Sequence, residues 1–85
     1  DRILAECYRN ALLLADHGMI GSIAFPSLAT GAYGYPVEDA APVALDTIRG
    51  LVPELRNVRL IRFVLFSEED LHVYERVLTR ITLEG

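Results

Sequence analysis

The residues best suited to chemistry are concentrated in one stretch, residues 25–36, which reads Phe-Pro-Ser-Leu-Ala-Thr-Gly-Ala-Tyr-Gly-Tyr-Pro. An apolar strand leads into a glycine-rich, aromatic turn, and a helix follows. Gly31 and Gly34 allow main-chain conformations closed to other residues and let a ligand approach without meeting a Cβ. The helix adds N–H groups that lack helical acceptors, together with the positive end of its dipole. The stretch therefore predicts a phosphate cradle.

Phe66 ends the second apolar run of the chain, residues 58–66. Because ligands bind at the carboxyl ends of parallel strands, we expect Phe66 and the glycine turn to face the same edge of the sheet. A phosphate site beside an aromatic platform indicates a nucleotide pocket. The alternative interpretation is structural, with a turn that only connects strand to helix and with Phe66 in the core.

These residues must be positioned by helices and strands. Residues 2–16 predict an amphipathic helix, with Asp16 off its apolar stripe and with His17 and Gly18 at its end, Gly18 being available for a left-handed cap. The apolar stripe comprises Ile3, Leu4, Cys7, Tyr8, Ala11, Leu12, Leu14 and Ala15.

Two strands are predicted, over residues 22–28 and 58–66. The first lacks polar alternation, which is typical of a strand covered on both faces. Pro26 cannot donate to a neighbouring strand and is expected to mark the end of pairing. The second becomes wholly apolar toward Phe66, so we expect its far end to be buried.

The middle helix is expected to begin near Glu38 to Ala41, because Pro42 is tolerated without loss of a hydrogen bond only in the first turn. A last helix should follow Ser67, which serves as N-cap before three acids. The inward residues of the middle helix are predicted to be Ala40, Ala41, Ala44, Leu45, Ile48 and Leu51, and those of the last helix Leu71, Tyr74, Val77, Leu78 and Ile81.

The resulting order is α-β-α-β-α, an α/β fold whose strands are parallel neighbours. Two strands cannot cover three apolar helix stripes, so we expect the sheet to continue in strands from a missing N-terminal part or from a partner chain, including a homodimer. The chain starts at Asp1, and a helical pattern is already running by Ile3. We therefore interpret residues 1–85 as one incomplete domain.

Composition narrows the class of protein. The chain has 85 residues, of which 52% are hydrophobic and 24% charged, a balance that argues against disorder. The net charge is −4 and the eight basic residues are scattered arginines, so no duplex nucleic acid partner is predicted. Cys7 is the single cysteine, which favours a reducing, cytoplasmic setting. No apolar run has the length of a membrane span, so no membrane partner is predicted.

Side chains suited to acid–base catalysis are few. His17 and His72 are interpreted as helix-end and solvated residues. The acids Glu38, Asp39, Glu68, Glu69 and Asp70 are interpreted as helix-start residues, and no pair has a spacing that demands general acid–base chemistry. We predict no metal site and no cofactor.

Four runs together resemble the macrodomain family, in matching order: Cys-Tyr-Arg-Asn at 7–10, Ser-Ile-Ala-Phe-Pro at 22–26, Ala-Thr-Gly-Ala-Tyr-Gly-Tyr-Pro at 29–36, and Phe-Val-Leu-Phe at 63–66. The chain looks most like the bacterial O-acetyl-ADP-ribose deacetylases and mono-ADP-ribosyl hydrolases. The resemblance covers about the C-terminal half of a macrodomain. It implies the C-terminal part of a three-layer α/β/α fold with a larger mixed sheet.

The resemblance also implies roles for individual residues. In the family the turn wraps the diphosphate of ADP-ribose through backbone N–H groups, the turn's aromatic residue lies against the distal ribose, and an aromatic residue lies beside the adenine. Tyr33 is thereby a positioning residue for catalysis, and Phe66 is the adenine contact, while Tyr35 and Pro36 shape the turn. The diphosphate contacts fall on Ala29, Thr30, Gly31, Ala32 and Gly34.

Two departures from the family pattern are visible, at Ala29 and at Pro42, which stands where relatives commonly have an ordinary helix former. Many relatives carry serine at the position of Ala29, which matters only if that contact uses a hydroxyl group. The family's adenine-recognising aspartate and its asparagine-rich catalytic loop match no residue of this chain.

The resemblance implies that the intact domain binds ADP-ribose and hydrolyses its derivatives, by O-acetyl-ADP-ribose deacetylation or mono-ADP-ribosyl-protein hydrolysis. Whether the chain is an enzyme stays open, and these 85 residues alone are expected to be inactive. One alternative is a reader module that binds ADP-ribose on proteins without cleaving it. The other is a fragment that folds only with a partner chain and binds nothing alone.

Overall fold

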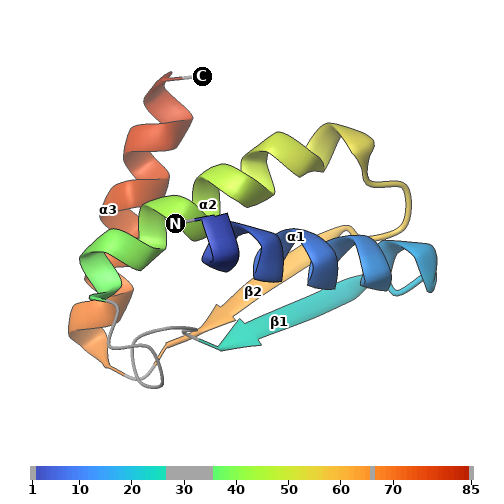
Figure 1. The fold of residues 1–85 in the computed structure, drawn as a ribbon. Coiled ribbons are helices and arrows are strands. Elements are labelled where there is room, and N and C mark those ends of the chain that lie inside the picture. The colour runs from blue at the N-terminus through green and yellow to red at the C-terminus, as the bar shows by residue number, and fades with distance from the viewer. Residues whose placement is uncertain (1, 27–35, 66, 85) are drawn as a thin grey trace.

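The computed structural model describes residues 2–26, 36–65 and 67–84, with only the main chain described for 82–84 (Figure 1). In chain order the elements are α1 (Arg2–His17), β1 (Ser22–Pro26), α2 (Val37–Leu51), the short 3-10 helix η1 (Val52–Glu54), β2 (Leu60–Val64) and α3 (Glu68–Glu84). The predicted α-β-α-β-α order is confirmed. Within the described ranges, no helix is long and apolar enough to cross a membrane.

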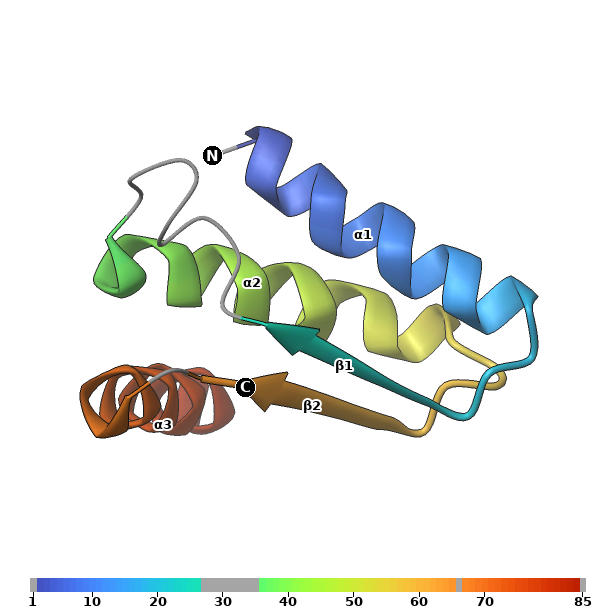
Figure 2. The same ribbon diagram turned by 90° about the horizontal axis from the view of Figure 1, so that it is seen from below.

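The two strands are parallel neighbours, as predicted. Their register runs from the pair Ser22 and Leu60 to the pair Pro26 and Val64, so pairing ends at Pro26. Both α1 and α2 lie on one face of the sheet, and α3 packs against α2, crossing it rather than running parallel to it (Figures 1 and 2). The helix α2 is the crossover that returns the chain from β1 to β2 in the same direction.

A row of aromatic rings joins the layers. Tyr8 of α1 meets Phe25 of β1 edge to face, with ring centroids 5.0 Å apart. Phe25 lies 5.8 Å from Phe63 of β2, and Phe63 lies 5.0 Å from Tyr74 of α3. Phe63 packs against both hydrophobic clusters, one under α1 and α2 and the other between α2 and α3. The row therefore links the two clusters into a continuous core.

The inward face of α2 is confirmed, because all six predicted residues are buried. The helix begins at Val37, however, one residue before the expected range. Pro42 consequently lies in the second turn, where it lacks the N–H that would donate to the carbonyl of Glu38. The prediction rested on the proline and on the acidic residues Glu38 and Asp39, whereas burial of the alanine face stabilises the helix against the proline's cost of roughly 3 kcal/mol.

The buried stripe of α1 is narrower than predicted. Leu4, Tyr8, Leu12 and Ala15 are buried, whereas Cys7 is exposed. The predicted stripe residues Ile3 and Leu14 are 68% and 75% exposed. The neighbours that the structure describes for α1 lie on one side of it, so residues at the flanks of the stripe stay in solvent. Asp16, which was expected off the stripe, is buried.

The left-handed residue after α1 is Met19, with a φ of 60°, rather than Gly18. The N–H of Met19 donates to the carbonyl of Asp16 at 3.1 Å, and that of Ile20 donates to Ala15 at 3.0 Å. This pair of bonds is a Schellman motif. Because the helix runs through His17, the turn falls one residue beyond the glycine, and a side chain occupies the left-handed position.

The sheet face away from α1 and α2 is open among the described residues. Phe25 and Phe63 belong to the core, whereas Ala24, Leu60 and Val64 are exposed. The predictions that both faces of the first strand are covered and that the far end of the second is buried are therefore wrong for these residues. In α3, Leu71 and Leu78 were predicted inward but are 45% and 53% exposed.

Candidate functional site

The predicted site lies where β1 and β2 end. Pro26 and Val64 form the last pair of the register, so the two strands end side by side. Residue 27 follows Pro26 directly, and residue 66 is two positions beyond Val64. The segments carrying the glycine turn and Phe66 therefore leave the sheet from adjacent points. We call this place the carboxyl edge.

The predicted ligand contacts themselves lie outside the described residues. This holds for residues 27–35, which include the proposed positioning residue Tyr33, and for Phe66, which follows β2 in the sequence. The other members of the set are Ala29, Thr30, Gly31, Ala32 and Gly34. The structure thus describes the elements that flank these residues, and the residue roles stay predictions.

The first turns of α2 and α3 lie at the same end of the molecule as the carboxyl edge (Figures 1 and 2). The first N–H groups of a helix have no acceptor within it and carry the positive end of the dipole. In α3, the hydroxyl of Ser67 accepts the N–H of Asp70 at 3.1 Å, which confirms the predicted N-cap. In α2, Pro36 is the N-cap residue and contributes no side-chain hydrogen bond. Of the two helix starts, α2 is the better placed to offer N–H groups to a ligand.

The side-chain charges at the start of α2 do not attract anions. Glu38 and Asp39 occupy the first turn, and both are exposed. These carboxylates oppose a phosphate electrostatically. Any anion bound beside α2 must therefore be held by main-chain N–H groups rather than by net charge, which agrees with the type of contact predicted for the turn.

The amino ends of β1 and β2, opposite the carboxyl edge, are held by one buried carboxylate, that of Asp16 at the end of α1. Its Oδ1 accepts N–H groups from Asn57 at 2.7 Å, Val58 at 2.9 Å and Arg56 at 3.1 Å. The Asn57 side-chain amide donates in turn to the main-chain oxygen of Asp16 at 2.8 Å. Hydrogen bonds from Val58 and Asn57, with smaller contributions from Arg56 and His17, lower the pKa of Asp16, and burial opposes them.

The anchor at Asp16 continues into the strands. The carbonyl of Gly21, just before β1, accepts the N–H groups of Arg59 at 2.8 Å and Leu60 at 3.2 Å. The amino ends of β1 and β2 are thus held by hydrogen bonds that run from α1 into the sheet. These bonds set the register that brings Pro26 and Val64 together at the carboxyl edge.

Sequence reasoning missed Asp16, although a signal was present. An acidic side chain in the last turn of a helix is disfavoured by the dipole. Asp16 occupies that position in α1, so it requires a compensating partner elsewhere. The misfit between residue type and position could have identified it as an anchor.

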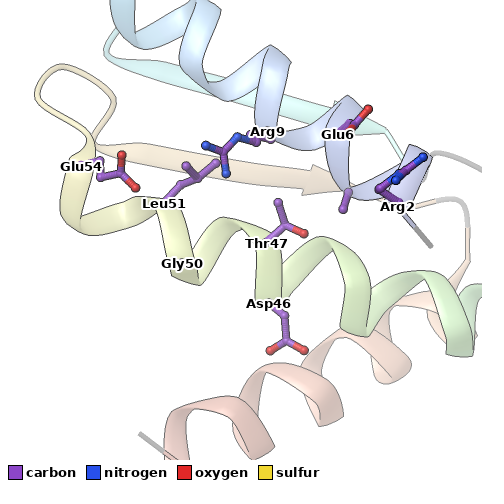
Figure 3. Close-up of a pocket in the computed structure, with 9 residues that line it drawn as sticks. Arg2, Glu6, Arg9, Asp46, Thr47, Gly50, Leu51 and Glu54 are labelled. Atoms are coloured by element: carbon purple, nitrogen blue, oxygen red, sulfur yellow. The ribbon is translucent and has the colours of Figure 1, made fainter.

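A groove of 540 Å³ lies between α1 and α2 on the flanks of both helices. Arg2, Glu6 and Arg9 line it from α1 (Figure 3). Arg9 points toward Leu51, whereas Asp46 points away from α1, with its Oδ1 3.8 Å from Nη2 of Arg49. Positively and negatively charged side chains both line the groove, so its charge favours no single class of ligand. The carboxyl edge therefore stays the candidate site.

The two histidines occupy different places. His17 is the last residue of α1, as predicted, and lies beside the Asp16 anchor at the amino ends of the strands. His72 is exposed in the first part of α3. Their positions agree with the helix-end and solvated interpretations.

Similar proteins span a longer chain. A Macro domain-containing protein of Chlorobaculum tepidum is 47% identical over 76 residues, which are 89% of this chain and 44% of that protein. The O-acetyl-ADP-ribose deacetylase of Enterobacter cloacae is 44% identical over 78 residues, covering 92% of this chain and 43% of its own length. The chain thus spans less than half the length of these curated relatives.

Solved structures share the fold. The Oceanobacillus iheyensis macrodomain with ADP matches 99% of this chain and 44% of its own, with a TM-score of 0.92 and 44% identity. The Trypanosoma brucei macrodomain in complex with ADP-ribose matches 91% of this chain and 34% of its own, with a TM-score of 0.84 and 33% identity. The sequence pattern of the Macro domain matches residues 1–44, just over half of the 85 residues. The chain therefore belongs to the Macro domain family.

Proposed function

We propose that the carboxyl edge is the diphosphate-binding part of an ADP-ribose site. The observation that carries the proposal is the convergence of the ends of β1 and β2 with the start of α2, which has no side-chain cap. Parallel α/β sheets bind ligands at this position. Relatives solved with ADP and with ADP-ribose support the choice of ligand.

Main-chain N–H groups of the turn, including those of Gly31 and Gly34, hold the diphosphate in this proposal. Tyr33 lies against the distal ribose, and Phe66 stacks beside the adenine. The acids Glu38 and Asp39 make side-chain attraction of the anion unfavourable, so affinity rests on main-chain donors and on stacking.

For the complete domain we propose hydrolysis of ADP-ribose derivatives, with removal of an acetyl ester or of a protein-linked ADP-ribose as the two candidate reactions. The relative named O-acetyl-ADP-ribose deacetylase supports the first. Positioning is the chemical contribution of this chain. Fixed N–H groups on the diphosphate and Tyr33 against the ribose would hold the scissile bond beside a water molecule.

Calorimetric titration of ADP-ribose into the chain tests the binding site. We expect saturable heat from the unmodified chain. Phe66→Ala should weaken binding by about 1–3 kcal/mol, the usual worth of a base stacked on an aromatic ring. Leu14→Ala is the control, because Leu14 is 75% exposed near the end of α1, away from the carboxyl edge, and it should bind within about threefold of the unmodified chain. A folded sample that gives no heat at millimolar ADP-ribose would refute the proposal for this chain.

A second assay separates an enzyme from a reader. Release of acetate from O-acetyl-ADP-ribose and of ADP-ribose from a mono-ADP-ribosylated protein would be measured for the chain joined to the part of the Enterobacter cloacae deacetylase that it does not match. Tyr33→Ala should lower turnover more than affinity if Tyr33 positions the reacting ribose. Equal losses in both would contradict a catalytic role, and binding without turnover would favour a reader.

A further inference from the structure

The groove between α1 and α2 opens on the side of these helices that faces away from the sheet. In Figure 3 the ribbon of β2 lies behind the side chains that line the groove. A layer added to the open face of the sheet, on the other side of the strands, would therefore leave the groove uncovered. This surface is available to a partner even when the sheet is covered on both faces.

The two walls of the groove carry opposite charges. Arg2 and Arg9 line the α1 wall with Glu6 between them, whereas Asp46 of α2 and Glu54 of η1 line the other wall. All five side chains are exposed. Of the five, Asp46 alone forms an ion pair with another described residue. Each wall thus presents charges that a complementary surface can neutralise.

Gly50 lies in the groove, and nothing in the described chain requires a glycine there. A Cβ added at Gly50 would meet no atom within 4 Å, and its φ lies outside the left-handed region. The residue is not a helix cap, because α2 continues to Leu51 and its C-cap is Val52, with a right-handed φ of −49°. Glycine weakens a helix interior relative to alanine. Close approach of a second chain is a physical reason for a position without a Cβ.

We propose that this groove is the interface of a symmetric dimer with a second copy of the chain. A twofold axis along the groove sets the α1 wall of each copy against the α2 wall of the other, so each arginine wall meets an acidic wall. An axis across the groove would set arginine wall against arginine wall, which charge repulsion disfavours. An acidic or a basic partner would match one wall and oppose the other, whereas a second copy carries both.

The order of residues along the groove agrees with this arrangement. In Figure 3 Arg2 lies toward the end of the groove that holds Asp46, and Arg9 lies toward the end that holds Glu54. Rotation about an axis along the groove keeps each residue at the same level. Arg9 of one copy therefore lies nearest the level of Glu54 of the partner subunit. The surface is separate from the carboxyl edge, so the proposal does not depend on the ADP-ribose site.

Sedimentation velocity over a range of concentrations tests the dimer. We expect the chain to show a monomer–dimer equilibrium that added salt weakens, since exposed charges are screened. Gly50→Leu should weaken the dimer at least about tenfold, because its side chain fills the approach between the helices. The same variant should raise the urea midpoint of the chain, since leucine favours a helix and meets open space at this position. Opposite effects on dimer and fold separate a blocked interface from unfolding.

Exchange of charges tests which walls meet. Arg9→Glu and Glu54→Arg should each weaken the dimer at least about tenfold, because each change places like charges together at both ends of the twofold. A one-to-one mixture of the two variants should restore it. In the mixture the new carboxylate at position 9 faces the new guanidinium at position 54, and the unaltered arginine faces the unaltered glutamate. Arg76→Glu is the matched control, an exposed arginine of α3 outside the groove, and should dimerise within about twofold of the unmodified chain.

Four results would overturn the proposal. The first is a folded chain that stays monomeric at every concentration. The second is self-association that Gly50→Leu leaves intact, which would assign it to another surface such as the open sheet face. The third is equal weakening by Arg9→Glu and Arg76→Glu, and the fourth is a mixture that does not restore the dimer. No nucleotide is present, so these outcomes are independent of the ADP-ribose titration.

Discussion

Replacement of Leu12 by alanine is the sharpest test of the described core. Leu12 is on the inner face of α1, has no exposed surface, and belongs to the cluster that contains Tyr8 and Phe25. Alanine removes three carbon atoms from this site. The neighbours come from two helices and the sheet, so they cannot all move inward to fill the space.

The expected loss is large for a chain of this size. Leucine-to-alanine changes at buried sites cost about 2–5 kcal/mol, from the lost transfer energy and the cavity that remains. We place Leu12→Ala in the upper half of this range because its exposure is zero. A typical 85-residue domain has a stability of about 4–13 kcal/mol, so the variant should lose a substantial share of it.

Urea unfolding followed by circular dichroism measures the effect. Leu14→Ala is the matched control, since Leu14 lies on the same helix with 75% of its surface exposed. It should stay within about 0.5 kcal/mol of the unmodified chain, because leucine and alanine differ little in helix propensity. If Leu12→Ala costs no more than Leu14→Ala, α1 does not pack on the sheet as described.

Three further predictions concern the Asp16 anchor, the turn at Met19 after α1, and the row of aromatic rings. The Asp16 carboxylate stabilises the fold fully above its ordinary pKa of 3.8, and this contribution is lost as the pH falls through its lowered folded pKa. The urea midpoint of Asp16→Asn should therefore fall less steeply with decreasing pH than that of the unmodified chain. Equal slopes for the two proteins would rule this out. Met19→Gly should raise stability by about 0.5–1 kcal/mol in the same assay, since glycine accepts a φ of 60°. Phe63 is partly buried, so Phe63→Ala should cost less than the roughly 3–5 kcal/mol typical of a fully buried phenylalanine, and a loss below about 1 kcal/mol would show that the two clusters do not depend on it.

The order of elements was predictable because periodicity and end signals agree. Ser67 is a clear N-cap, and the alanine-rich face of α2 recurs at helical spacing. Both signals are local, so they can be read without knowledge of distant contacts. The parallel pairing of the strands also follows, because a helix connects them.

The extent of burial was not predictable in the same way. Leu14 and Leu71 read as inward residues because they are apolar and suitably spaced, yet each lies beyond the described neighbouring elements. Burial depends on what packs against a helix, which its own sequence does not specify. The prediction for Asp16 was wrong in the opposite direction: it was expected outside the buried stripe but is buried, because its hydrogen-bond partners are main-chain groups some 40 residues later.

The candidate site, too, was only partly predictable from the sequence. The location of the site was predictable, because the parallel strands β1 and β2 end side by side at Pro26 and Val64. The roles of individual residues came from the family resemblance, because a glycine turn by itself does not distinguish ADP-ribose from another phosphate ligand. Tyr33 and Phe66, which carry that distinction, lie outside the described residues.

The Asp16 anchor has a consequence for how this molecule could be altered. It holds the amino ends of β1 and β2, at the far edge of the sheet from the predicted ligand contacts. In the proposed function, strand alignment and ligand choice therefore depend on opposite ends of the same two strands. Libraries that vary residues 27–35 are accordingly expected to yield new nucleotide specificities, while the hydrogen bonds at the amino ends of the strands preserve strand alignment. A protein whose binding and structural residues are separated in this way can change its ligand with little loss of stability.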